Sequence, residues 1–347
     1  MKRTSLLAAG VAASLCMGIG QAADANELYL YNWSNYFPPE LLKKFEEDTG
    51  ISVTLDVYDS NETMLARLQA GAAGYDVVVP SDYMMEIMIE EGLVERIDTG
   101  EMENFANVTK PHDSPRQDPE RAYSAPYLWG TTGFTYDSAR VEGELEESWK
   151  EFFEPRAELS GQIAVLNDEV EAYNAAAYYS GIFKCTEDPA EAQQILDVLQ
   201  AQAPHVAMYQ SDGTIDRMAA GELIMHMQFN GAAHRAKQQR DSLVYVYPKE
   251  GMSFWNDNFM VPKGAPNLEN AKTFINWMMA PENIAIASNY TGYMNAIRGS
   301  SDFMDESLVE DPAVNMPEEY ADRLRPTEDC SVKARELRNR VWTRLRS

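Results

Sequence analysis

The sequence is poor in the residues on which most enzyme and metal sites are built. It has four histidines and three cysteines among 347 residues. It has no glycine-rich phosphate loop, no metalloprotease histidine pair and no nucleophile elbow. His226 and His234 are eight residues apart and would share one side of a helix, but no carboxylate or cysteine at ligand spacing joins them. We therefore interpret both histidines as structural and expect no metal site and no cofactor.

Long apolar runs are absent beyond the first twenty residues, which argues against a membrane span in the rest of the chain. Lys2 and Arg3 precede the apolar run 6–19, and Gly20 and Ala22 occupy the small-residue positions of a cleavage site. The run is too short to cross a bilayer. Residues 1–22 are thus predicted to be a signal peptide, and the mature protein is predicted to be periplasmic.

The three cysteines fall into two groups. Cys16 lies in the predicted signal peptide and raises the alternative of a lipoprotein, but Leu15 stands before it where a lipobox has a small residue. Cys185 and Cys330 would reach an oxidising compartment after export, and we expect a disulfide between them. Neither has the short spacing of a metal site.

Positive charge is also scarce. Lysine and arginine number 29 against 55 aspartates and glutamates, for a formal net charge of -26. Loss of residues 1–22 removes Lys2 and Arg3 and no acid, which takes the charge to -28. Such a chain repels nucleic acid and anionic lipid and attracts cations. We expect no nucleic-acid partner; the acidity permits a cationic ligand, although a role in solubility alone would also explain it.

The remaining pattern is an alternation of strands and helices. Strand-like runs at 28–31, 53–58 and 76–80 are separated by helical patterns, which is the βαβαβ order of a mainly parallel sheet covered by helices. The alternation resumes between about 133 and 248. The roughly 325 mature residues exceed one typical core, so an α/β fold with two lobes is predicted.

Ligands bind beyond the carboxyl ends of the strands in such sheets. This places two segments at a candidate site, Trp33 to Tyr36 after the first strand and Ser81 to Tyr83 after the third. Asp168 and Glu171 are three residues apart on one face of a predicted helix, either as a functional pair or as acids that favour a helix start. Because carboxylates are so frequent in this sequence, their number does not exclude a hydrolase that uses one as an acid and another as a base. A hydrolase is therefore the rival class of function.

Several segments carry a resemblance. They are LYLYNWSNYFPP (28–39), YDSNETM (58–64), YDVVVPS (75–81), YLWG (127–130), FWND (254–257) and Gly292-Tyr293. In unbroken order along the mature chain, they resemble the periplasmic spermidine/putrescine-binding proteins of ABC transporters. The resemblance implies a type II periplasmic-binding-protein fold, that is, α/β with two mixed sheets, flanking helices and a hinge. Residues 26–131 plus 257–301 would form lobe 1, and 132–256 plus 302–347 would form lobe 2.

The resemblance also implies a ligand site. An aromatic box would hold the methylene chain of a polyamine, formed by Trp33, Tyr36, Phe229, Trp255 and Tyr293. Carboxylates would meet its ammonium groups, at Asp168, Glu171 and Asp257. Further contacts are expected in the two strand-end segments, at Ser34, Asn35, Ser81, Asp82 and Tyr83. A polyamine suits such a site because aromatic faces cover its carbons and attract its charges, while carboxylates accept charge-assisted hydrogen bonds.

This chain departs from the family pattern at three site positions. Asn35 stands where relatives carry an acid, Ala232 where relatives preferring a diamine carry another, and Phe229 where a tryptophan is common. Asp82 is a candidate substitute for the missing charge. The choice among putrescine, spermidine and other amines therefore stays open, with a weak preference for a triamine because Ala232 removes the acid most useful for a short diamine.

The implied function is capture of a small cationic polyamine by closure of the two lobes and delivery to an inner-membrane ABC permease. A sensor that signals through a membrane receptor would use the same site and is the alternative. We expect a monomer without catalytic residues.

Overall fold

The computed structural model describes residues 26–71 and 74–347. The predicted signal peptide, with Cys16, lies outside the described residues. Within the described part of the chain, no helix combines the length and apolar character that crossing a membrane requires.

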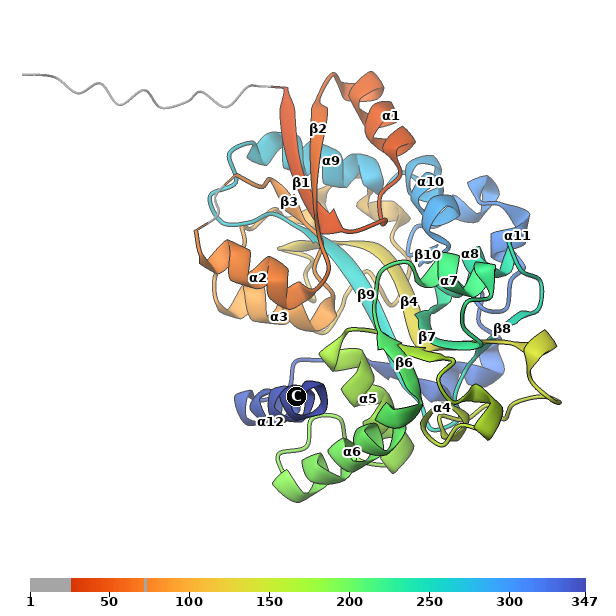
Figure 1. The fold of residues 1–347 in the computed structure, drawn as a ribbon. Helices are drawn as coiled ribbons and strands as arrows, with labels where there is room; N and C mark the ends of the chain where they lie inside the picture. The colour runs from red at the N-terminus through yellow and green to blue at the C-terminus, as the bar shows by residue number, and fades with distance from the viewer. Residues whose placement is uncertain (1–25, 72–73) are drawn as a thin grey trace, which may run out of the picture.

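Strands and helices alternate through the described residues (Figure 1). The strands are β1 (Glu27–Trp33), β2 (Ser52–Tyr58), β3 (Val77–Val78), β4 (Ser124–Asp137), β5 (Ile163–Val165), β6 (Val206–Tyr209), β7 (Met225–Phe229), β8 (Leu243–Val246), β9 (Met252–Met260), β10 (Met294–Asn295) and β11 (Leu324–Pro326). The α-helices are α1 (Pro39–Thr49), α2 (Asn61–Gln69), α3 (Asp82–Glu90), α4 (Lys150–Phe153), α5 (Glu169–Ser180), α6 (Pro189–Gln202), α7 (Thr214–Ala220), α8 (Asn230–Lys237), α9 (Leu268–Met278), α10 (Pro281–Thr291), α11 (Glu306–Val309) and α12 (Val332–Arg346). Short 3-10 turns lie at Thr99–Glu101, Glu103–Asn107, Ser138–Arg140, Ala157–Leu159, Ala203–His205, Ser300–Phe303 and Glu318–Arg323.

The strands pair in the order β2-β1-β3-β9-β4-β7-β5-β6, with β8 and β10 also on β4 and β11 also on β9. β1 is parallel to β2 and β3, whereas β9 and β4 are antiparallel to each other. These two long strands run side by side through the middle of the molecule (Figure 1). The α/β fold is confirmed, but the expected two sheets are joined: because β4 and β9 continue from one half into the other, hydrogen bonding is continuous through both.

Two main hydrophobic cores pack on this sheet, one on each half. The first core packs α1 and α9 against the β1 half, around Leu28, Phe45, Phe259 and Phe274. The second core packs α4, α5 and α6 against the β5 half, around Phe134, Trp149, Phe152 and Leu196. Separate cores are what two lobes need, since each can keep its packing while the pair moves. The exact lobe bounds stay a prediction.

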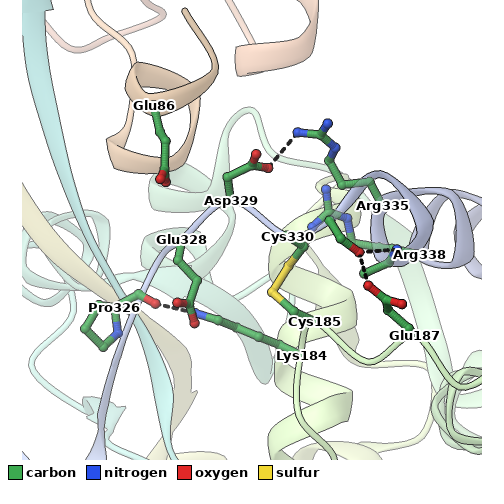
Figure 2. Close-up of a disulfide and its surroundings, with 12 residues drawn as sticks. Glu86, Lys184, Cys185, Glu187, Pro326, Glu328, Asp329, Cys330, Arg335 and Arg338 are labelled. Atoms are coloured by element: carbon green, nitrogen blue, oxygen red, sulfur yellow. Dashed lines mark hydrogen bonds and ion pairs between the residues drawn. A yellow bond between two sulfur atoms is a disulfide. The ribbon is translucent and has the colours of Figure 1, made fainter. Parts of the chain in front are cut away.

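A disulfide ties the C-terminal segment to the second core. Cys185 and Cys330 are joined, with their Cα atoms 5.2 Å apart (Figure 2). Beyond the disulfide, α12 packs on α5 and α6, and its Leu337 and Val341 belong to the second core. The basic character of this helix is partly neutralised there, because Arg338 pairs with Glu169 at 3.2 Å.

Candidate functional site

A cavity of about 540 Å³ is lined by residues from both halves of the molecule. Twelve of the thirteen site residues predicted from the sequence line it, namely Trp33, Ser34, Asn35, Tyr36, Ser81, Tyr83, Asp168, Glu171, Phe229, Trp255, Asp257 and Tyr293. They come from the ends of β1, β3 and β7, the start of α5, the middle of β9 and the residue before β10. The folding of the chain thus gathers positions up to 260 residues apart, as expected at strand ends of an α/β sheet.

The central strand β9 supplies the floor of this cavity. Successive side chains of a strand point to opposite faces, so Trp255 and Asp257 share one face while Phe254 and Asn256 share the other. Trp255 and Asp257 line the cavity. Phe254 and Asn256 line a second cavity of about 410 Å³ on the other face.

Asp257 is buried without a cationic partner in the described residues. Only 5% of the residue is exposed, and its Oδ1 accepts a hydrogen bond of 2.6 Å from the Ser81 hydroxyl. The buried Tyr36 hydroxyl faces the same carboxylate without completing a hydrogen bond. Burial raises the pKa of Asp257 to about 7, and Ser81 and Tyr36 offset part of that rise. A carboxylate in this setting gains strongly from a cation placed beside it.

Asn61 organises the side chains around Asp257. Its amide nitrogen donates to the Ser81 hydroxyl at 3.2 Å and to the Tyr83 hydroxyl at 3.0 Å, and its oxygen accepts from the Ser81 backbone at 3.2 Å. Tyr83 in turn donates to Glu62 at 3.0 Å. Ser81 and Tyr83 are thereby held in fixed orientations at the edge of the cavity.

A second acidic group comes from the start of α5. Asp168 caps this helix, since its Oδ1 accepts hydrogen bonds from the backbone of Val170 (2.9 Å) and Glu171 (3.0 Å). Burial, and then the nearby charge of Asp168, raise the pKa of Glu171, which is 7% exposed. Burial also raises the pKa of Asp168, the charge of Glu62 adds to the rise, and the two capping hydrogen bonds oppose it. Asp168 therefore caps α5, and both acids line the cavity.

The aromatic residues form a chain of edge-to-face contacts along the cavity. Ring centroids are 5.8 Å apart between Phe229 and Trp255, 5.1 Å between Trp255 and Tyr293, and 5.7 Å between Tyr293 and Tyr36. Trp33 stands apart from this chain. Its ring is tilted by 55° against Tyr58, with centroids 4.8 Å apart, and its indole nitrogen donates to the Val79 carbonyl at 2.8 Å. The rings therefore offer an apolar lining with fixed geometry.

Two glycines allow α8 and the end of α10 to approach closely at this lining. Gly292 has φ +83°, and a Cβ there would lie 2.6 Å from the Gly231 carbonyl oxygen. A Cβ on Gly231 would lie 2.5 Å from the Tyr293 ring. A side chain at position 231 would displace the Tyr293 ring, and one at position 292 would push the backbone of α8 away.

Asp82 corrects the sequence prediction, because it does not line this cavity. Its carboxylate points to the opposite face of β9, where it accepts hydrogen bonds from Asn256 (2.9 Å) and Asn258 (3.2 Å). It lines the second cavity together with Arg121. The reason is local: Ser81 faces the Asp257 side, and Asp82 then begins α3 with its side chain directed the other way. Asp82 is therefore no substitute for the acid missing at Asn35.

The two histidines that were expected to share a helix face lie on different elements. His226 lies on β7 and His234 on α8, so they share no helix face. Instead, His234 contacts Asp311 at 2.7 Å and His226 contacts the Met227 carbonyl at 2.7 Å. Among residues 26–71 and 74–347, no cluster of three or more potential ligands could hold a metal ion.

Sequence reasoning missed part of the lining. The loop before α7 and the first turn of that helix contribute Ser211 to Asp216, and α8 contributes Arg235. A polar loop gives no signal of its own. Arg235, by contrast, lies three residues after Ala232 and so shares a helix face with a position already singled out.

Comparison with known proteins assigns the chain to a family. Residues 40–317 match the model of the bacterial extracellular solute-binding protein family. The spermidine/putrescine-binding periplasmic protein of Escherichia coli is 36% identical over 84% of both chains. The putrescine-binding periplasmic protein SpuD of Pseudomonas aeruginosa is 32% identical over 100% of this chain and 99% of its own.

The fold agrees with this placement. A solved structure described as a putative spermidine/putrescine ABC transporter from Listeria monocytogenes superposes with a TM-score of 0.87 at 29% identity, covering 92% of this chain and 99% of the other. The family is extracytoplasmic and these bacterial relatives are periplasmic, in agreement with the predicted export. The chain belongs to the bacterial extracellular solute-binding proteins, in the group that holds the periplasmic spermidine/putrescine-binding proteins.

Proposed function

We propose that this protein captures a small polyamine in the 540 Å³ cavity and delivers it to an inner-membrane ABC permease. The observation that carries the proposal is the pairing of buried, cation-free carboxylates with an apolar aromatic lining. Asp257 lies on β9 and Asp168 and Glu171 on α5, so charged groups of a ligand would be met at separate places. The Phe229–Trp255–Tyr293–Tyr36 chain supplies the surface for its methylene groups.

Closure of the two halves is the proposed means of capture. Tyr36 and Tyr293 pack in the first core, whereas α5 packs in the second. A ligand that contacts both groups binds the closed arrangement better than the open one and shifts the balance by that difference in affinity. The long strands β4 and β9 connect the halves and are the proposed hinge. The closed form is the one presented to the permease.

The proposal also covers what the protein does not do. It acts as a binding protein without chemical turnover, as a monomer, and without a nucleic-acid partner, in line with a net charge of -26 and with relatives named as binding proteins. Signalling to a membrane receptor would use the same cavity and is the second candidate function.

Mass spectrometry of ligand released by denaturation from purified protein tests the proposal, followed by a thermal-shift series with putrescine, spermidine and agmatine. We expect an unmodified aliphatic amine in the extract and a rise in melting temperature that saturates with amine concentration. A protein that responds to no amine would contradict the polyamine function, and conversion of the amine would favour the hydrolase class.

A further inference from the structure

One cation lines a cavity that is otherwise acidic. Arg235, half-buried on α8, is the only lysine or arginine among the lining residues in the described part of the chain. The other ionised side chains of the lining are carboxylates, at Asp59, Asp168, Glu171, Asp212, Asp216 and Asp257. A cavity adapted only to cations would not place a guanidinium within it, because like charges repel.

The Arg235 guanidinium forms no ion pair with the described residues. No carboxylate of residues 26–71 and 74–347 lies within 4 Å of it as a salt-bridge partner, and its recorded contact is with the face of Tyr290, 5.1 Å from the ring centroid. Its hydrogen-bond donors therefore remain available to a group inside the cavity.

Arg235 belongs to a small polar cluster. Its guanidinium lies over the Tyr290 ring, and the Tyr290 hydroxyl donates to the Asn35 side-chain oxygen at 2.9 Å. The positive charge of Arg235 also reaches Tyr293, whose pKa burial raises and Arg235 lowers. Asp168 and Glu171, in contrast, belong to α5.

Neither Asn35 nor Ala232, two lining positions near Arg235 in the fold, supplies an acid to an ammonium group. Asn35 is neutral, and Ala232, which shares the α8 face with Arg235, is apolar. Three features thus agree: a guanidinium without an ion pair among the described residues, a neutral amide at Asn35 and an apolar side chain at Ala232. An ammonium group placed beside Arg235 would be repelled by it.

Resting on the proposed function, we propose that the preferred ligand is an amine whose end beside Arg235 bears an oxygen acceptor, a carboxylate or an amide carbonyl, in place of a terminal ammonium. Asp257 and the α5 acids hold its ammonium groups, and the guanidinium donates to its oxygen. Arginine suits this role because its fixed fork of donors matches carbonyl and carboxylate oxygens.

Calorimetric titration of the wild type with three probes tests this ranking: spermidine, mono-N-acetylspermidine and 5-aminopentanoate. We expect at least one of the two oxygen-bearing probes to bind about tenfold more tightly than spermidine, and the stronger of them identifies the amide or the carboxylate as the acceptor. In Arg235→Gln, we expect that advantage to disappear and spermidine to bind about tenfold more tightly than it does to the wild type.

Lys237→Gln is the matched control, since it removes the same charge from the same helix at a position outside the cavity lining. It should leave the ranking unchanged. Asn35→Asp is a second variant with an intact Arg235, and it should shift preference toward spermidine by placing an acid in the cluster. Amine binding in the wild type with a ranking that Arg235→Gln does not alter overturns the inference alone, whereas indifference to all three probes and to putrescine overturns the proposed function as well.

Discussion

The two faces of β9 carry buried acids in opposite circumstances. Asp257 faces the aromatic cavity, where a serine hydroxyl is its hydrogen-bond donor and no cation balances its charge. Asp82 faces the second cavity, where two asparagine amides donate to it and the buried guanidinium of Arg121 adds a favourable charge. Burial raises the pKa of both, to about 7 for Asp257 and about 6 for Asp82.

The difference teaches how a structural acid and a ligand-binding acid are told apart. The network around Asp82 is closed, because Arg121 is itself held by Ser124 (2.8 Å), Asn258 (2.7 Å) and the His112 carbonyl (2.9 Å). Asp257 leaves its charge uncompensated until something from outside supplies a cation. A buried acid without an internal counter-ion marks the position that a cationic ligand completes.

The largest effect should come from Asp257→Asn. The amide keeps the shape and the Ser81 contact but loses the charge, so amine binding should weaken by about 2–5 kcal/mol, the usual cost of removing one partner of a buried charged hydrogen bond. Isothermal titration with spermidine or putrescine measures the loss. An affinity unchanged within threefold would mean that Asp257 does not meet the ligand and that the contrast between the faces has no functional content.

The same substitution should stabilise the ligand-free protein. The folded pKa of Asp257, about 7, is above the ordinary value of 3.8, so its favourable contribution is complete below about pH 4 and is lost as the pH rises to 7. At pH 8, Asp257→Asn should therefore raise the free energy of unfolding by about 2–4 kcal/mol, and little at pH 4. Urea denaturation of ligand-free protein at both pH values checks this, and equal effects at the two would contradict it.

Amine affinity itself should depend on pH. An ammonium ligand needs the ionised carboxylate, so affinity should rise by up to about tenfold per pH unit between pH 5 and 7. It should rise further above pH 7 while Glu171, whose pKa burial also raises, becomes ionised. The amines stay protonated throughout this range. Titrations at unit intervals measure the slope, and Asp257→Asn is the control, in which only the contribution of Asp168 and Glu171 should remain. A flat profile in the wild type would show that Asp257 is already ionised when free.

The smallest effect should come from Asp82→Asn. We expect amine affinity within about threefold of the wild type, because the side chain lies on the far face of β9. The pKa of Asp82, about 6, is above the ordinary value of 3.8, so removing its charge at pH 8 should raise the free energy of unfolding, as for Asp257. The gain should be smaller, up to about 2 kcal/mol, because the loss of one accepting oxygen and of the attraction to Arg121 offsets part of it. A large loss of binding would show that the two faces are coupled through the strand.

Much of the fold and of the cavity lining could be predicted from the sequence, but the contrast between Asp257 and Asp82 could not. Twelve of the predicted site residues line one cavity, because strand ends and motif matches define backbone positions. Asp82 was misplaced because a one-residue step at a strand end reverses the face, and only the pairing of Ser81 with Asp257 reveals which residue points inward.

Arg235 and Asn61 show a second limit. Asn61 lies within the matching segment 58–64 but was given no site role, although it fixes two site side chains. Arg235 is one basic residue among several on a short helix. The continuous sheet was likewise hidden, because nothing in the periodicity of β4 says that it pairs with strands of both halves. Such long-range pairings depend on the tertiary arrangement.

The covalent link between Cys185 and Cys330 has a practical consequence for anyone who produces this protein. It closes a loop spanning 145 positions and fastens the segment that leads from β11 into α12 (Figure 2). In the reducing cytosol of an expression host that bond would not persist, and α12 would depend on packing alone. Recombinant material should therefore be directed to an oxidising compartment, and thiol reductants should be kept out of the purification buffers.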